Sequence, residues 1–295
     1  MKKQTRIEEK TPKTNFNFKR NSLIFFQLFR LIGKAFYKNV RGPLFTYIIP
    51  IFFTTIFYFL FSSNNSSNKG STLLGYIALP CLTILTSLSA SIVEWKNSIF
   101  LKRMDTTGIS KKNFILCIWI FYFMVGWSGV VVELLAGMAI GREDVIDLYK
   151  TMNWWFFILA ISLINLMSIG IATLLGGNLS DDGANQGISM IIYFICIFFS
   201  GVMLDPRLYE TSDGIRIFSY FIPLKYPVAL LLFSQIEDGD WSNAGFNTGR
   251  WDVTRQPEPK FQDFTDTWQP VVGAILIIIA LFVITALTFK WHKKR

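Results

Sequence analysis

The chain has 295 residues, of which 52% are hydrophobic and 29 are phenylalanine, and its formal net charge is +9. A mean hydropathy of +0.39 excludes an ordinary soluble domain, because the apolar residues gather in long runs. The three cysteines lie inside these runs and are odd in number, which argues against a disulfide framework. A single histidine, His292, excludes a metal site of the usual ligand count and a Ser/His/Asp catalytic set.

Six apolar runs are long enough to cross a bilayer, which takes about 20 residues of helix for about 30 Å of hydrocarbon. They cover residues 44–61, 73–93, 114–140, 154–175, 188–204 and 271–289. A β-barrel would instead show short segments of alternating hydrophobicity. We therefore predict an all-α membrane protein with six transmembrane helices, in a membrane domain over residues 43–290. The polar, Lys-rich residues before the first run do not resemble a cleaved signal peptide.

The basic residues are distributed unevenly between the two sides of this topology. With the N-terminus in the cytosol, twenty of the 29 Lys and Arg residues fall on the inner side. Because Lys and Arg concentrate in cytosolic segments, both termini are expected in the cytosol. The basicity is explained by topology and by attraction to anionic lipid, so a nucleic-acid partner is not expected.

The N-terminal region divides into a flexible basic tail over residues 1–21 and an amphipathic helix over residues 22–42. Three cations recur every four residues on one face of this helix, namely Arg30, Lys34 and Lys38. Apolar residues occupy the other face, namely Leu28, Leu31, Ile32, Ala35 and Phe36. The segment is too short and too charged to span, so we predict an interfacial helix at the inner leaflet. A plain polybasic anchor is the alternative. Residues 291–295 form a second basic tail.

The third predicted span contains the only acid deep within an apolar run, Glu133. An ionisable residue inside the membrane is a candidate for function, here in a substrate path or an ion pair. Glu133 lies 19 residues after Phe114, about 28 Å along a helix. It is therefore expected near the outer headgroups, where it would reach water.

Residues 176–187 after the fourth span are glycine-rich and are predicted to form an inner loop. Neither this loop nor the rest of the chain contains the Gly-x-x-x-x-Gly-Lys-Ser/Thr motif that binds nucleotide phosphates. No nucleotide-binding domain is expected in this chain, so any ATP would be bound by another subunit.

After the fifth span, residues 205–269 form a long outer segment. Its apolar part is interrupted by Pro223 and Pro227 and is too short to cross. Irregular backbone at membrane depth must be covered by protein or line a cavity, so we predict two short helices that re-enter from the outer side.

These elements together resemble the permease subunit of an ABC-2 type (type V fold) exporter over about residues 22–290. The resemblance rests on the flat basic helix before the first span and on two further motifs. The inner loop after the second span carries Glu94, Leu101-Lys102-Arg103 and Thr106-Thr107-Gly108-Ile109-Ser110. The outer segment carries Phe199-Ser200-Gly201, Pro206 and Pro223-Leu224-Lys225-Tyr226-Pro227. The chain departs from the family at Gly108, where proline is common, and in a longer, more acidic loop over residues 234–268.

The resemblance implies a dimer of permeases driven by two cytosolic ATPase subunits, which would bind ATP and Mg²⁺. The chain itself would then hold no cofactor and no metal and would not be an enzyme. The inner loop would insert an amphipathic helix of about residues 95–102 into the ATPase. The expected coupling residues are Glu94, Trp95, Ile99, Phe100, Leu101, Lys102 and Arg103. The expected outer-gate residues are Ser200, Gly201, Pro206, Pro223, Tyr226 and Pro227.

The cargo and the mechanism each leave alternatives open. Phe-rich spans suit an amphipathic or lipid-like cargo, such as a drug, a lipid or an antimicrobial peptide, whereas aromatic residues would also suit a polysaccharide or teichoic acid. A secondary transporter would show buried charges in several spans, and here only Glu133 qualifies. An intramembrane enzyme would need a catalytic cluster that the spans lack. The Lys, Asn, Phe and Ile bias fits an AT-rich bacterium and hence the plasma membrane.

Overall fold

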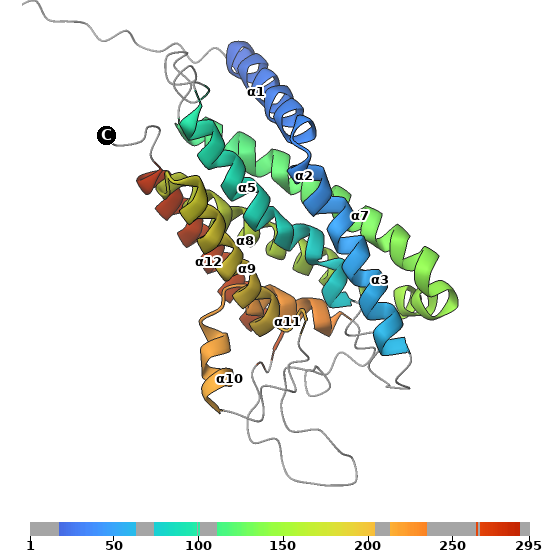
Figure 1. The fold of residues 1–295 in the computed structure, drawn as a ribbon. Helices are drawn as coiled ribbons and strands as arrows, with labels where there is room; N and C mark the ends of the chain where they lie inside the picture. The colour runs from blue at the N-terminus through green and yellow to red at the C-terminus, as the bar shows by residue number, and fades with distance from the viewer. Residues whose placement is uncertain are drawn as a thin grey trace, which may run out of the picture.

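A computed structural model describes residues 18–62, 74–98, 100, 111–203, 213–234, 264 and 266–289. Its regular elements are helices (Figure 1): α1 (Phe18–Lys38), α2 (Arg41–Pro43), α3 (Ile49–Ser62), α5 (Leu79–Asn97), α7 (Lys111–Thr151), α8 (Trp154–Asn178), α9 (Asp182–Phe199), α10 (Asp213–Tyr220), α11 (Lys225–Phe233) and α12 (Trp268–Thr288). Within these residues, six helices are long and apolar enough to span a membrane: Arg41–Leu60, Leu74–Asn97, Asn113–Gly141, Trp154–Asn178, Asp182–Phe199 and Trp268–Thr288. The predicted helical class and its six spans are confirmed.

The helices α5 and α8 form the centre of the bundle and are the most buried spans, whereas few residues of α3, α9 and α12 are buried. Small residues let the central helices approach closely. A Cβ at Gly176 of α8 would lie 2.8 Å from the Ser89 carbonyl oxygen of α5. Asn165 of α8 reaches α7, where its side chain donates a 2.9 Å hydrogen bond to the Phe123 carbonyl oxygen.

One end of the bundle, here called the terminal end, gathers the end of α1, the ends of α5 and α8, and the starts of α7 and α9 (Figure 1). Contacts between these segments define it. Asn97 at the end of α5 donates to Asp182 at the start of α9, and Asn178 of α8 donates to Thr288 of α12. The rings of Trp95 and Phe114 lie 6.3 Å apart.

The opposite end, here called the far end, is where α7 turns back on itself. Tyr149 donates a 3.5 Å hydrogen bond to the carbonyl oxygen of Leu134, although a straight helix would separate these residues by about 22 Å. Gly137 lies under the Tyr149 hydroxyl, which is 2.7 Å from an added Cβ. The backbone of Asn153 then donates to the Ser234 carbonyl oxygen at 2.7 Å. This bond joins the start of α8 to the end of α11.

The helices α10 and α11 form a pair bent by 98°. The pair lies at the far end (Figure 1), where Ser234 directly after α11 contacts Asn153 directly before α8. α11 is buried against α8 and α12. The pair therefore begins and ends on one side, as a re-entrant segment does.

One predicted loop is much shorter than expected. We predicted that residues 176–187 form a glycine-rich loop, but α8 continues to Asn178 and α9 begins at Asp182. The reason is local: Asp181 caps α9 by accepting a 2.7 Å hydrogen bond from the Ala184 backbone N–H. This cap offsets the low helix propensity of the glycines that follow.

Candidate functional site

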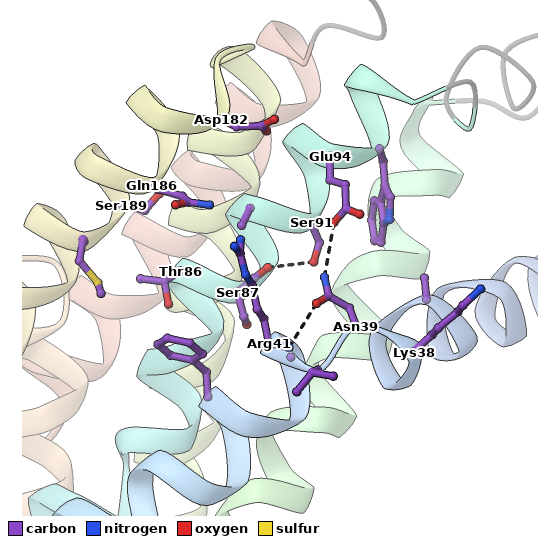
Figure 2. A pocket seen from close by; sticks show the side chains of 17 residues that line it. Lys38, Asn39, Arg41, Thr86, Ser87, Ser91, Glu94, Asp182, Gln186 and Ser189 are labelled. Carbon is purple, nitrogen blue, oxygen red and sulfur yellow. Dashed lines mark hydrogen bonds between the residues drawn. The ribbon is translucent and has the colours of Figure 1, made fainter.

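A cleft of about 1270 Å³ opens at the terminal end between three walls (Figure 2). The first wall is the end of α1 with α2 and the start of the first span. The second is the C-terminal part of α5 from Thr86 to Trp95, and the third is α9 from Asp182 to Met190. The cleft thus joins the first span, the stem of the loop after the second span, and the fifth span.

The first wall is shaped by the break between α1 and α2. The side-chain oxygen of Asn39 accepts a 3.2 Å hydrogen bond from the Arg41 backbone N–H, and its amide nitrogen donates to Glu94 at 3.4 Å. The Arg41 side chain extends into the cleft between α5 and α9 (Figure 2). Within the described part of the chain, its guanidinium forms no hydrogen bond or ion pair.

The other two walls are tied together by a buried polar cluster. Ser89 of α5 donates to the Asn185 side chain of α9 at 2.7 Å, and its hydroxyl lies 2.9 Å from that of Ser189. These bonds fix α9 against α5 where Ser189 lines the cleft. These polar side chains are shielded from water, so they form hydrogen bonds between the two helices instead.

The cleft changes in chemistry with depth. Glu94 and Asp182 lie toward the terminal end and Arg41 extends beside Ser87 (Figure 2), whereas Phe45 lies one turn beyond Arg41 and Met190 lies further along α9. By helical rise, Met190 is about 12 Å deeper than Asp182. The lining is therefore acidic at the mouth, carries Arg41 and several hydroxyl groups in the middle and is partly apolar at the floor.

Two of the predicted coupling residues line the cleft, Glu94 and Trp95. Glu94 is exposed, but Trp95 lies within α5 and is only 8% exposed. The predicted amphipathic helix therefore does not begin at Trp95, because α5 continues to Asn97. Trp95 instead packs against Phe100, with 5.7 Å between ring centroids. Four coupling candidates lie outside the described residues: Ile99, Leu101, Lys102 and Arg103.

Lys96 has a structural role that its sequence pattern did not reveal. The sequence indicates only one more cation of the segment after the second span, yet Lys96 is buried. Its Nζ donates to the carbonyl oxygens of Gly177 and Leu179 at 3.0 Å. A cation at the carboxyl end of a helix is favourable, because the last carbonyl groups lack partners within the helix. Lys96 therefore fixes the stem of the loop to the end of α8.

At the far end, the predicted gate residues lie on two segments. Ser200 and Gly201 directly follow α9, and Gly201 has φ 94°. The carbonyl oxygen of the next residue, Val202, lies close to Gly75, and it would be 2.3 Å from a Cβ on that glycine. Only glycine fits both positions without strain. Pro223, Tyr226 and Pro227 shape the turn between α10 and α11 and the start of α11. Pro206 lies outside the described residues.

The same turn holds a second buried lysine that was not predicted as a site residue. Lys225 is fully buried. Its Nζ lies 2.8 Å from the Ser219 hydroxyl and 3.7 Å from the Tyr220 ring centroid. A cation over an aromatic face is attracted to the ring. These contacts tie α11 back to α10 across the 98° bend.

Glu133 is buried, whereas we expected it to reach water. Its side chain is only 1% exposed, and neither carboxylate oxygen has a hydrogen-bond partner among the described residues. The expectation was wrong because α7 turns back and places Tyr149 over this level of the helix. Burial raises the pKa of the Tyr149 phenol above its ordinary value, and the Glu133 carboxylate adds to the rise.

The segment that we predict to be interfacial forms α1, and with one exception its two faces differ in exposure as expected. Arg30, Lys34 and Lys38 are exposed, and Leu28, Ile32 and Phe36 are buried. Leu31, assigned to the apolar face, is instead exposed. The buried face packs on α7: the rings of Phe29 and Phe121 lie 5.3 Å apart, and those of Phe36 and Tyr122 lie 5.8 Å apart. The sequence pattern missed this contact with α7.

Among the described residues, no three His, Cys, Asp or Glu side chains lie close enough to hold a metal ion. The fold and the cleft define a polytopic helical membrane protein with a polar cavity at one end. Residues 63–289 match the family model described as ABC-2 family transporter protein. The match covers most of the chain, so the protein belongs to the ABC-2 family and is an ABC-type permease. No curated protein matches the chain.

Proposed function

We propose that this chain is the membrane subunit of an exporter driven by separate ATPase subunits, and that the terminal end faces the cytosol. The observation that carries this proposal is the position of the cleft. Glu94 and Trp95 line it and also form the stem of the loop that would bind the ATPase. A movement of this loop would therefore be transmitted directly to the cavity, which is the rigid-body coupling expected of such a transporter.

The cargo proposed here is an amphipathic or lipid-like molecule such as a drug, a lipid or an antimicrobial peptide. The charged mouth and partly apolar floor of the cleft support it. Exposed apolar residues continue beyond the floor on the two helices that flank it, Ile48 and Phe52 on the first span and Ile191 and Phe194 on α9. A second permease would complete the path along these faces.

Glu133 is proposed to act later in the path, as a contact for cargo or as one half of an ion pair. An acid without a partner at this burial is costly, and such costs persist mainly where function requires them. The α10–α11 pair, with Ser200, Gly201, Pro206, Pro223, Tyr226 and Pro227, would form the outer gate. α1 would lie at the inner leaflet with its cations toward the headgroups.

The test is purification of tagged full-length protein from its native membranes in a mild detergent. We expect a nucleotide-binding ATPase to copurify and ATP hydrolysis to be measurable in the preparation. If other membrane complexes survive the same detergent and no ATPase is present, a transporter that works without ATP becomes the better account. Glu133 would then be the first residue to replace.

A further inference from the structure

We propose that the cleft at the terminal end binds the headgroup of an amphiphile that carries both a phosphate and an amine. This inference rests on the proposed function, because it names the chemical class of the cargo. It is drawn from the charges of the cleft, from their separation onto different walls, and from the change in lining with depth.

The charged residues of the cleft are separated by sign. Both cations, Lys38 and Arg41, belong to the wall formed by α1 and α2. Both acids belong to the facing walls, Glu94 on α5 and Asp182 on α9. In Figure 2 the Arg41 side chain extends between α5 and α9, and Glu94 and Asp182 lie nearer the terminal end. A ligand in the cleft therefore meets positive and negative charge at different positions along it.

The cationic wall offers its donors to a ligand. The Arg41 guanidinium points into the cleft (Figure 2) and forms no hydrogen bond or ion pair within the described residues. The planar guanidinium presents paired N–H groups that match two oxygens of a phosphate. Lys38 also lines the cleft, but its side chain runs along α1 away from Arg41 (Figure 2). A phosphate is the group that this wall would bind best.

The acidic walls are held in place by amides and not by cations. Asn39 donates to Glu94 at 3.4 Å, and Asn97 donates to Asp182 at 3.2 Å. Each amide orients a carboxylate but leaves its negative charge uncompensated. An ammonium group on the ligand would supply the missing positive charge.

This arrangement disfavours ligands of a single sign. A purely anionic headgroup would bring its charge toward Glu94 and Asp182, and a purely cationic one would bring its charge toward Lys38 and Arg41. Like charges brought together weaken binding. A headgroup with a phosphate and an amine satisfies both walls at once.

The floor of the cleft indicates that the ligand continues into an apolar part. Phe45 and Met190 line the deeper region, and exposed apolar residues extend beyond it on the flanking helices, including Phe52 and Ile191. A soluble molecule would gain nothing from this surface, whereas an acyl chain would bury area against it. The ligand is therefore an amphiphile of the adjacent leaflet.

The test compares four probes on the full-length protein, purified with whatever subunits accompany it, by native mass spectrometry. Three share one acyl chain: lysophosphatidylethanolamine, lysophosphatidylglycerol and a monoacylglycerol. The fourth is soluble O-phosphoethanolamine. We expect lysophosphatidylethanolamine to bind at least about threefold more tightly than lysophosphatidylglycerol, with the monoacylglycerol and the soluble probe weaker still.

Two variants test the two walls separately. Arg41→Gln removes the phosphate contact and should weaken both phospholipid probes by about tenfold. Asp182→Asn keeps the shape of the side chain and should reduce only the preference for the amine, because Glu94 remains. The control, Lys150→Gln, removes an exposed cation at the far end and should change neither value.

Three results would overturn the proposal: equal or tighter binding of lysophosphatidylglycerol by the unaltered protein, equal binding of the soluble probe, or no effect of Arg41→Gln. The comparison among probes needs no variant, so a variant that fails to fold does not remove the test. Because ATPase copurification is scored in the same samples, loss of probe selectivity with the ATPase present refutes only the ligand assignment.

Discussion

Lys96 provides the sharpest test of how the loop stem is held, through the substitution Lys96→Met. Methionine preserves the length and apolar body of the side chain but removes the ammonium. The carbonyl groups of Gly177 and Leu179 at the end of α8 then lose a charged donor. The bond to Gly177 is buried and the bond to Leu179 is part-buried, so water replaces the lost donor only in part.

The magnitude follows from the two hydrogen bonds. Each bond from a charged donor contributes about 1.5–3 kcal/mol, and the favourable position at a helix end adds to this. Removing a buried ammonium also removes its own desolvation cost, which offsets part of the loss. We therefore expect a net destabilisation of about 3 kcal/mol, or a fall in Tm of about 6 °C at this chain length.

The assay is thermal unfolding of the full-length protein in detergent, followed by tryptophan fluorescence. The matched control is Lys150→Met, because Lys150 forms an exposed ion pair with Asp147 at 2.9 Å, and exposed pairs contribute about 0–1 kcal/mol. If the two variants unfold within about 1 °C of each other, the Lys96 contacts do not stabilise the stem and the reasoning is wrong.

Three further predictions address packing, the buried acid and topology. Gly75→Ala should lower Tm, because the added Cβ would lie 2.3 Å from a carbonyl oxygen. The control Gly187→Ala should raise Tm slightly, because nothing lies within 4 Å of its Cβ and alanine favours a helix. Equal effects of the two substitutions would contradict the close packing at Gly75. Glu133→Met should raise stability by about 1–3 kcal/mol by removing unpaired buried oxygens while export falls, and unchanged export would remove Glu133 from the path. In intact cells an impermeant maleimide should label Lys150→Cys but not Lys34→Cys. The unaltered protein should stay unlabelled, because its three cysteines are buried. The opposite labelling pattern would show that the topology is inverted.

The spans were predictable from sequence, because a helix that crosses hydrocarbon needs a long run of apolar residues and such runs are recognisable in the sequence. The helices found as spans 3 and 4 begin within one residue of their predicted starts. The fifth span was predicted to begin at residue 188 but begins at Asp182. Its first turn depends on the cap at Asp181, and the glycines nearby masked that signal.

The buried charges were less predictable, because burial depends on contacts far apart in sequence. Lys96 is buried by the end of α8, more than 80 residues away, and Glu133 is covered where α7 turns back at Tyr149. A hydropathy profile contains neither contact. The lysine of the Pro-Leu-Lys-Tyr-Pro sequence could have been suspected, since a charge within an apolar segment needs a partner.

The cleft likewise depends on contacts that the sequence does not reveal. Lys38 and Glu94 were recognised from the sequence as separate features, whereas Arg41 and Asp182 were not singled out. Their meeting in one cavity depends on the break at Asn39, which bonds to both Arg41 and Glu94. A sequence pattern identifies such residues one by one, and only the fold places them opposite each other.

The most direct test of the central claim is to measure how much ATPase copurifies with two variants, each of which replaces one apolar side chain by an acidic one. Leu101→Asp alters the loop proposed to bind the ATPase. Phe221→Asp alters an exposed aromatic residue at the far end and is the control. We predict that Leu101→Asp loses the ATPase while Phe221→Asp retains it. Equal retention by both variants would contradict the claim that this loop connects the permease to its motor.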